Sequence, residues 1–588
     1  KGQGFMMKTH ILLYLLLNSL SPGLGIFRGL PFTYFYNQKF VPSLSDQEIS
    51  NEINVVHKTP KVPEFSLYYV TSGILRIPYA EIEEPFNAWV DFSKRRSRID
   101  YYGGIMKTYQ LGDALEYGTM LKVAPMTNEV VENILTCFQV NGSSDFKVNA
   151  QRMIPDLTNY EYVTDTVMNG VSVQEFQMTQ KEGSKQSQYT IWIGYQGGLK
   201  GHENIPVPIR YEMKGYNSLL GSHYDHYILD YNSYSIEIPS DEVFKTDSSL
   251  TCRSFPGPGI RDAEHRTLMN PISEYLHGDD SHISTHFERF KGIHGKYYEG
   301  AKEELLRATI FKHNFRFIQS FNRKGLSYKL NVNHLADRTP EEVSVLRGRR
   351  PHKGSNDGQL FKYSGEDVLN APEYIDWRLY GAVTPVKDQS VCGSCWSFGT
   401  TGTIEGALFL KTGSLVRLSQ QSLIDCSWGM GNNGCDGGED FRAYKWMMAH
   451  GGIPTADSYG PYMGIDGFCH SENSTRVAIT GFVNVTSGDQ QALKVALFLH
   501  GPISVAIDAS PRTFTFYSHG VYYDDHCKNG QDDLDHAVLL VGYGNLDGEN
   551  YWLIKNSWST YWGNDGYILI SQKKNICGVA TTPTFVTL

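Results

Sequence analysis

A cysteine begins a predicted helix in the segment that contains Gln389, Cys392 and Cys395. Apolar residues follow at helical spacing, and Gly413 predicts the end of the helix. The N-terminus of a helix carries partial positive charge, which favours the thiolate form of a cysteine over the thiol. The segment therefore predicts a nucleophilic cysteine, and such a nucleophile needs a base from elsewhere in the chain.

His536 is the candidate base, because it opens a continuous apolar run that predicts a buried strand. A buried strand would hold the imidazole in a fixed orientation. Downstream, Asn556 supplies an amide that can orient the ring, and Trp558 and Trp562 supply apolar surface that keeps water away. These residue types predict nucleophilic catalysis by a cysteine, in which no step needs a metal or another cofactor.

In this order, the motifs resemble those of papain-type cysteine peptidases of the cathepsin L group, over residues 366–588. The resemblance implies that Cys395 attacks a peptide carbonyl, and that His536 pairs with the thiolate and then protonates the leaving amine. It implies that Asn556 orients His536, and that Gln389 and the Cys395 backbone N–H stabilise the oxyanion. Papain-type thiols paired with histidine have a pKa of about 3 to 4, so we expect a thiolate even in acid.

The resemblance also implies the fold, which is α+β: a two-lobed papain-like peptidase with one helical lobe and one β-barrel-like lobe. A helical propeptide and an N-terminal antiparallel β-rich domain precede it. We expect a signal peptide at residues 7–25, the β-rich domain at 26–255, an inhibitory propeptide at 280–365 and the peptidase at 366–588. This order resembles the two-chain haemocyte cysteine proteinases of insects, in which the β-rich part is cut from the peptidase and can stay associated with it.

Six residues of the predicted propeptide recur at intervals of three or four, which places them on one helical face. They match the pattern of cathepsin L-type propeptides: Glu303, Arg307, Phe311, Asn314, Ile318 and Asn322. A second motif of that family follows at Asn333, Leu335 and Asp337, with Asn331 where the family usually has glycine. The resemblance implies that this segment inhibits the enzyme by running through its active-site cleft.

The predicted propeptide also suggests how the enzyme is activated. We expect Phe287, Phe290 and Tyr297 to pack its helices together. The mature enzyme is expected to begin near Leu369–Pro372. Acid is expected to loosen the propeptide, because its carboxylates would be protonated and lose their salt bridges.

The cysteines and the apolar N-terminal stretch predict an oxidising compartment. Without Cys395, eight of the nine cysteines remain, an even number that suits four disulfides. The resemblance implies the pairs Cys392–Cys435, Cys426–Cys469 and Cys527–Cys577, which leaves Cys137 and Cys252 for each other. Glycosylation sequons stand at Asn141, Asn473 and Asn484. We expect a secretory-pathway protein with a lysosomal or extracellular destination.

The N-terminal third is rich in short runs of Tyr, Val, Ile and Thr, separated by Gly, Asn and Pro. This pattern predicts a curved antiparallel sheet or a partly closed barrel, with a helix near Asn128–Phe138. His223, Asp225 and His226 could be drawn as a metal site, but no further ligand cluster lies nearby in the sequence. We therefore favour a surface strand end for these three residues.

Substrate choice is expected to depend on the pocket for the second residue before the scissile bond. Gly437 and Gly438 are followed by Glu439 and Asp440, where cathepsin L-like enzymes usually carry apolar residues. Ala506, Ala537 and a residue near Thr582 would complete a small to medium pocket, and Trp558 and Trp562 would lie beside the substrate. One hypothesis is that the acidic pair admits basic side chains. The alternative is that both carboxylates point into solvent at the rim.

Three functions are compatible with these residues, and all take proteins or peptides as partners. The first is a cysteine endopeptidase made as a zymogen that its own propeptide inhibits. The second is a dipeptidyl-peptidase similar to cathepsin C, in which a β-domain blocks one end of the cleft. The third is a secreted binding protein that uses the β-rich module. The net charge of −10 argues against nucleic-acid binding, and no segment reads as transmembrane.

Overall fold

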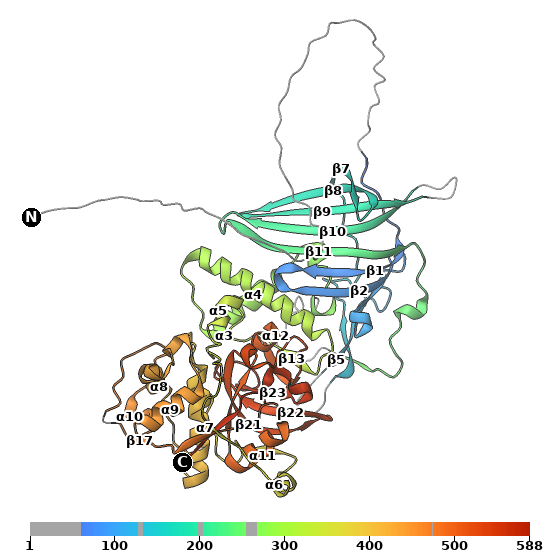
Figure 1. Cartoon of the computed structure of the whole chain (residues 1–588). Coiled ribbons are helices and arrows are strands. Elements are labelled where there is room, and N and C mark those ends of the chain that lie inside the picture. Colours follow the sequence, from blue (N-terminus) through green and yellow to red (C-terminus); the bar gives the residue numbers. More distant parts are fainter. Residues whose placement is uncertain (1–59, 127–132, 198–203, 255–266, 473) are drawn as a thin grey trace, which may run out of the picture. The chain divides into compact units, whose positions relative to one another are not determined.

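The computed structural model describes residues 60–126, 133–197, 204–254, 267–472 and 474–588 (Figure 1). The predicted signal peptide and Asn473 lie outside these ranges. Within the described residues, helices and strands both occur throughout the C-terminal half, so the α+β prediction is confirmed. No helix in this part of the chain is both long and apolar enough to span a bilayer.

A sheet of twelve strands forms the N-terminal part, which we call the sheet domain (residues 60–254). The strands are β1 (Tyr68–Ile77), β2 (Ile82–Asp91), β3 (Arg96–Tyr101), β4 (Met106–Leu111), β5 (Thr119–Met126), β6 (Ile134–Asn141), β7 (Glu161–Met168), β8 (Val171–Glu182), β9 (Lys185–Gln196), β10 (Ile205–Asn217), β11 (Ser222–Ser235) and β12 (Cys252–Ser254). The strands labelled β7 to β11, β1 and β2 lie side by side in Figure 1.

The sheet consists of two antiparallel meanders, β1–β6 and β7–β11, joined where β1 pairs with β11. Alternate residues of β1 and β2 are buried, as expected for a sheet with one face in a core. The described edge strands, β7 and β12, do not pair with each other, so the sheet is open rather than closed into a barrel. The antiparallel pairing of β1–β11 is as the sequence predicts, and of the described strands in this sheet only β12 pairs in parallel.

The helix predicted near Asn128–Phe138 is wrong. Residues 127–132 lie outside the described ranges, and β6 begins at Ile134. All eight residues of β6 pair with β5 in an unbroken antiparallel register. Cys137 also lies opposite Cys252 of β12, to which it is disulfide-bonded. Pairing on both sides therefore outweighs the local helical preference of this segment.

A helical region follows the sheet. It comprises α2 (Ser273–His277), α3 (Ser281–His294), α4 (Gly300–Asn322), β13 (Tyr328–Leu330) and α5 (Pro340–Ser344). Phe287 and Phe290 of α3 pack against Phe311 of α4 at ring-centroid distances of 5.4 and 5.0 Å. Tyr297 does not join them, because α3 ends at His294 and leaves Tyr297 88% exposed. Tyr298, the next residue, stacks on Phe287 instead.

The six periodic residues lie on one face of α4, as predicted, and tie the helix to the chain that follows it. Arg307 donates two hydrogen bonds to Glu342, at 2.7 and 2.9 Å. Asn314 donates to the carbonyl of Ala336, and Asn322 exchanges two hydrogen bonds with Leu330 of β13. Asp337 is buried and pairs with Lys296 at 2.9 Å. These bonds fix where the chain enters the C-terminal region.

The C-terminal region has a helical part and a sheet part. The helical part contains α7 (Cys395–Thr412), α8 (Gln420–Cys426), α9 (Asp440–Ala449) and α10 (Ala456–Tyr459). The sheet part contains β18 (Gly481–Asn484), β19 (Ile503–Ile507), β20 (Tyr517–Tyr522), β21 (His536–Leu546), β22 (Glu549–Lys555), β23 (Tyr567–Ser571) and β24 (Thr584–Thr587), with α11 (Gln490–His500) and α12 (Arg512–Thr515). Helix α7 packs against β21 and β19.

The chain between α5 and α7 contains β14 (Gln359–Leu360), α6 (Gly365–Asn370) and β15 (Ile375–Asp376). β14 adds to the sheet beside β18, and β15 pairs with β21. The structure also contains the disulfides Cys392–Cys435, Cys426–Cys469 and Cys527–Cys577, the pairs that the resemblance implies. Cys395 is a free, buried thiol.

Candidate active site

Cys395 is the first residue of α7, and the packing of α7 on β21 places it beside His536, the first residue of that strand. The backbone N–H of Ala537 donates to the Cys395 sulfur at 3.5 Å. Ser394, which precedes the helix, makes no side-chain hydrogen bond to the first turn. The free N–H groups of that turn and their partial positive charge are therefore available to the sulfur.

His536 and Asn556 form the second part of the site. Nε2 of His536 lies 2.8 Å from Oδ1 of Asn556, so the ring donates this hydrogen bond with its proton on Nε2. The Trp558 ring covers the imidazole at a centroid distance of 4.9 Å. Trp562 lies behind Trp558, and both tryptophans are buried. Nδ1 of His536 has no hydrogen-bond partner among the described residues.

Gln389 is the third part, and its amide is oriented by a residue that sequence reasoning missed. The Ser557 hydroxyl donates to Oε1 of Gln389 at 2.7 Å, which turns Nε2 toward the cysteine loop. That nitrogen donates to the carbonyl of Cys392 at 2.7 Å and to the carbonyl of Leu346 at 2.9 Å. Ser557 follows Asn556 directly, so the signal for it was its place in the same motif.

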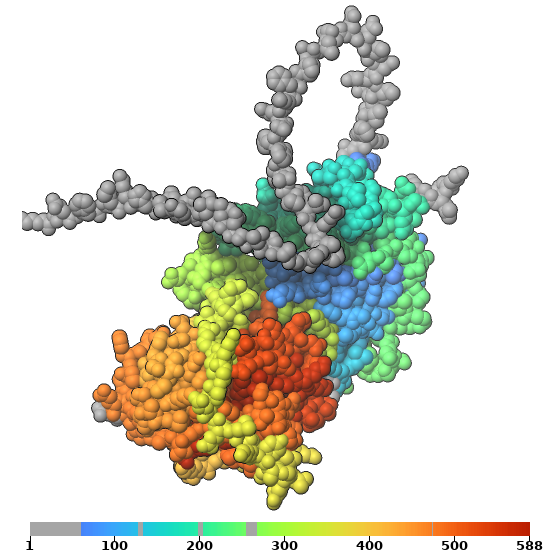
Figure 2. Space-filling view, in the orientation of Figure 1, coloured from blue at the N-terminus to red at the C-terminus, as the bar shows by residue number. Residues whose placement is uncertain are grey.

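Leu346 belongs to the segment that follows α5, residues 345–352, which we call the cleft segment. Figure 2 shows this part of the chain, in yellow, running between the orange and red parts of the C-terminal region. Its backbone pairs with Gly438 in a parallel bridge: Gly438 N–H donates to Gly348 at 2.9 Å, and Arg350 N–H donates to Gly438 at 3.1 Å. The cleft segment therefore occupies the space beside Cys395 through main-chain hydrogen bonds.

Two glycines permit this close approach. A Cβ on Gly348 would lie 1.7 Å from the carbonyl oxygen of Gly393, and a Cβ on Gly437 would lie 2.4 Å from the carbonyl oxygen of Gly348. Gly437 also has a φ of +113°, which side-chain-bearing residues rarely adopt. Gly437 and Gly438 thus lie directly against the cleft segment.

Three side chains of the cleft segment, two arginines and a histidine, face carboxylates of the C-terminal region. Arg347 pairs with Asp535 at 2.9 Å. Arg349 pairs with Glu439 at 3.0 Å, and His352 lies 2.7 Å from the other oxygen of Glu439. Sequence reasoning did not single out these contacts, although the arginine-rich run Arg347–Arg350 is a signal in the sequence.

Burial under the cleft segment changes the charge state of the site. Desolvation raises the pKa of the Cys395 thiol to about 11 and lowers the pKa of His536 to about 4. In this covered state, the thiol and the imidazole are both neutral at neutral pH. The expected thiolate is therefore not the favoured form while the cleft segment is in place.

The residues expected to form the substrate pocket do line one cavity, of about 320 Å³. Its walls include Glu439, Asp440, Ala506, Ala537 and Thr582, together with Arg349 and His352 of the cleft segment. Glu439 is only 3% exposed, so the rim-and-solvent interpretation is wrong for this residue in the covered state. Burial raises the pKa of Glu439, although Arg349 beside it acts in the opposite direction. Asp440 accepts hydrogen bonds from Ser504 and Thr584.

Other candidate residues have their own surroundings. Asn141 is exposed at the end of β6. The side-chain nitrogen of Asn484 donates to Asn356 at 2.6 Å, so a glycan on that nitrogen would displace this bond.

Asp225 and His226 lie at the start of β11, but Asp225 is buried, so the surface prediction is wrong for it. Asp225 binds Lys312 and Arg316, and His226 binds Glu212.

The comparisons with known proteins agree with this arrangement. Residues 371–587 match the family model for papain family cysteine proteases, and residues 287–343 match that for the cathepsin propeptide inhibitor domain. Digestive cysteine proteinase 1 of Homarus americanus is 44% identical over 51% of this chain and 94% of its own length. The cathepsin L-like peptidase of Aedes aegypti is 44% identical over 52% and 93%. A solved structure of digestive procathepsin L2 from Tenebrio molitor is 36% identical, covers 52% of this chain and 100% of its own, and has a TM-score of 0.49.

Proposed function

The chain belongs to the papain family of cysteine proteases and carries a cathepsin propeptide inhibitor domain, and we propose that it is the zymogen of an endopeptidase that uses Cys395, His536 and Asn556. The observation that carries this proposal is the position of the Leu346 carbonyl. It accepts from Gln389 Nε2 beside the free thiol, where a scissile carbonyl would need a donor.

In the proposed mechanism, removal of the cleft segment admits water and substrate and allows a thiolate–imidazolium pair to form. The Cys395 thiolate attacks the scissile carbonyl carbon of the substrate. The carbonyl oxygen becomes an oxyanion, which accepts hydrogen bonds from Gln389 Nε2 and the Cys395 N–H. His536 then gives the proton on Nδ1 to the leaving amine as the C–N bond breaks, which leaves a thioester. His536 then takes a proton from water, whose oxygen attacks the thioester carbon; the C–S bond breaks, the acyl group leaves as a carboxylic acid, and the thiolate–imidazolium pair is restored. Asn556 holds the ring throughout.

Zymogen processing is proposed to occur between the cleft segment and β15. Leu369 is 86% exposed at the end of α6, which makes the chain accessible to a protease there. The papain family match begins at residue 371, directly after this helix. A secretory origin with a lysosomal or extracellular destination is supported by the four disulfides, since such bonds persist in oxidising compartments.

We propose endopeptidase rather than dipeptidyl-peptidase activity. All described residues that line the cavity around Glu439 lie between positions 349 and 584, so the cavity has no wall from the sheet domain. The test is mass spectrometry of casein fragments produced by the processed protein. Cuts at internal peptide bonds are expected. Release of dipeptides alone would contradict the proposal, and absence of any cleavage would favour a binding protein.

The sheet domain is proposed to leave the peptidase easily once the inhibitor domain is cut out. Among the described residues, Glu81 of the sheet domain pairs with Arg512 of the C-terminal region at 3.4 Å, and Glu81 is exposed. Exposed pairs of this kind contribute about 0 to 1 kcal/mol. Persistent association after processing would need contacts other than this pair.

We propose that Glu439 lets the substrate pocket accept a basic side chain at the second position before the scissile bond. Support comes from Arg349 of the cleft segment, whose guanidinium already lies 3.0 Å from Glu439 in that pocket. Peptides with Phe, Val or Arg at that position test the idea. Glu439→Gln should lower kcat/KM for the Arg peptide by about tenfold, since one charge pair is worth about 1.4 kcal/mol at this burial.

The matched control is Asp436→Asn, because Asp436 is an exposed carboxylate close to the same wall. It should leave the preference among the three peptides unchanged. An equal loss for all three peptides in Glu439→Gln would contradict the selectivity role, and so would a parent enzyme that rejects the Arg peptide.

A further inference from the structure

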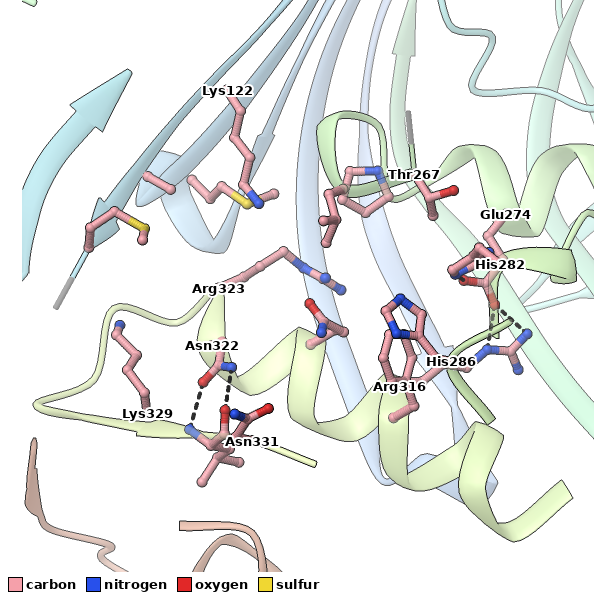
Figure 3. A pocket seen from close by; sticks show the side chains of 18 of the residues that line it. Lys122, Thr267, Glu274, His282, His286, Arg316, Asn322, Arg323, Lys329 and Asn331 are labelled. Carbon is pink, nitrogen blue, oxygen red and sulfur yellow. Dashed lines mark hydrogen bonds and ion pairs between the residues drawn. The ribbon is translucent and has the colours of Figure 1, made fainter. Parts of the chain in front are cut away.

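A second cavity, of about 270 Å³, lies away from Cys395, where the sheet domain meets the helical region (Figure 3). Among the described residues, the sheet domain contributes β4 and β5, the helical region contributes α2, α3, α4, β13 and the chain before α2, and the C-terminal region contributes only Ser518 and His519. The cavity is therefore a feature of the unprocessed chain and is separate from the catalytic cleft.

Most of the wall is apolar. The side chains that supply it come from both sides of the boundary: Met106, Ala124, Pro125, Leu268, Phe315 and Leu330. A cavity with such walls favours the apolar body of an organic ligand over an inorganic ion, because burying an apolar group stabilises by about 25 cal/mol per Å². Its size suits a small molecule.

Cationic side chains also reach the cavity, and most of them have a partner. Arg323 donates two hydrogen bonds to Glu84, each at 2.6 Å. Arg316 pairs with Glu274 and Asp225. These guanidinium groups are therefore neutralised by buried carboxylates.

Lys122 is different. Its side chain reaches from β5 into the cavity toward Arg323 (Figure 3), and it makes no hydrogen bond or ion pair with any described residue. Burial, with Arg323 close by, lowers the pKa of Lys122 to about 8. The amine is thus mostly protonated at pH 7. Glu84 lies close enough to raise its pKa, but both Glu84 oxygens are bonded to Arg323, so an anion in the cavity would offset the cost of desolvating this ammonium.

We propose that this cavity binds a small amphiphilic organic anion, a monocarboxylate with an apolar body. The carboxylate pairs with Lys122, and the apolar body packs on the Met106, Leu268 and Phe315 side of the wall. Because the sheet domain and the helical region share the wall, the ligand contacts both and stabilises their association. A ligand that binds only the assembled chain raises its stability by mass action.

Thermal unfolding of the full-length chain with Cys395→Ala, which cannot process itself, tests the proposal. Octanoate carries both the charge and the apolar body, octan-1-ol carries the apolar body alone, and acetate carries the charge alone. Octanoate is expected to raise the melting temperature and to bind about tenfold more tightly than octan-1-ol, because one charge pair at this burial is worth about 1.4 kcal/mol. Acetate is expected to have no effect at the same concentration.

Lys122→Met should abolish the preference for octanoate over octan-1-ol. Without ligand, it should leave the melting temperature equal or higher, since an unpaired buried charge is replaced by an apolar side chain of similar length. Lys181→Met, on an exposed lysine of β8 in the same sheet, should change neither property. The proposal is overturned if octanoate causes no shift, if octan-1-ol matches it, or if Lys122→Met keeps the preference. None of these outcomes bears on the peptidase activity of the processed enzyme.

Discussion

The cleft segment and helix α4 hold the inhibitor domain to its two neighbours by different means. The cleft segment binds the peptidase through main-chain atoms at Leu346, Gly348 and Arg350, and adds side-chain pairs, of which Arg349 with Glu439 is buried. Helix α4 binds the sheet domain through charged side chains that are almost fully buried. Arg316 lies 2.8 and 2.9 Å from the two oxygens of Asp225, and Arg323 binds Glu84.

This difference determines how each contact can be broken. Main-chain hydrogen bonds survive most side-chain changes, so the cleft contact keeps this part of its bonding when a charged side chain is replaced, and that part depends on the absence of a side chain at Gly348. A buried ion pair depends on each partner, because removing one leaves the other charged and desolvated. We therefore expect single substitutions to damage the sheet contact more than the cleft contact.

The largest effect is expected for Arg316→Met. It removes the guanidinium that the buried carboxylates of Asp225 and Glu274 share, and Asp225 then keeps Lys312 as its partner, so the loss should be about 3–5 kcal/mol of unfolding free energy, mainly from Glu274. Urea unfolding of the Cys395→Ala chain measures this loss. In the active chain, processing at pH 5 should be faster, while kcat/KM of the processed enzyme stays unchanged.

The matched control for that change is Arg417→Met, because Arg417 and Asp457 form an exposed pair at 3.5 Å. Its effect should lie within about 0.5 kcal/mol. Equal effects of the two substitutions would mean that the buried charges do not hold the sheet contact.

The folding stability of the zymogen is expected to begin to fall at a higher pH than protonation of its carboxylates alone would predict. Burial lowers the pKa of His313 in α4 to about 3 and that of His334 to about 4. Below pH 6.5 the unfolded chain binds protons at these sites and the folded chain does not, so stability is full above pH 6.5 and falls as the pH drops toward 4. His334 alone should contribute a loss on the order of 3 kcal/mol.

Other groups of the zymogen act differently with pH. Burial raises the pKa of Asp535 to about 6. The folded chain therefore binds a proton at Asp535 more readily than the unfolded chain, so this group stabilises the zymogen as the pH falls and offsets part of the loss. Arg307 lowers the pKa of Glu342. The stability that this ion pair gives the zymogen is therefore lost only when the pH falls below the ordinary Glu pKa of 4.5. Urea unfolding of the Cys395→Ala chain at pH 7 and pH 4.5 tests the balance. His334→Gln should flatten the pH dependence, and an unchanged slope would refute the histidine explanation.

A smaller effect is expected for Gly348→Ala in the cleft. The added Cβ would meet the carbonyl oxygen of Gly393, and relieving such an overlap typically costs about 1–3 kcal/mol. The initial rate of the unprocessed chain on a small peptide should therefore rise about tenfold to hundredfold. Gly365→Ala is the control, since a Cβ there meets open space. A rate equal to that of the control would show that the cleft segment does not need this glycine.

The two contacts also differ in how far the sequence predicts them. Cys395 at a helix start and His536 at a strand start follow from local patterns, and the structure places both where those patterns put them. The pairing of Asp225 with Arg316 joins residues far apart in the chain, and no local pattern encodes it. For this reason the sequence suggested a surface strand end at Asp225, and the buried partner was missed.

The errors in local structure have physical causes as well. The segment before Phe138 has helical preferences, but two neighbouring strands and a disulfide hold β6 extended. The prediction that Tyr297 packs with Phe287 and Phe290 is wrong because α3 ends at His294, and beyond that point the helical spacing no longer decides which residue faces the core. A sequence pattern predicts the end of a helix only to within one or two residues.

The most direct test of the central claim is labelling by an epoxide that reacts with active-site thiolates, followed by peptide mapping. Cys395 is predicted to be labelled stoichiometrically after processing in acid and to be unreactive in the intact zymogen, where the cleft segment covers it and burial raises its pKa to about 11. Failure to label Cys395 in the processed protein would contradict the assignment of the nucleophile. Equal labelling before and after processing would contradict inhibition by the cleft segment.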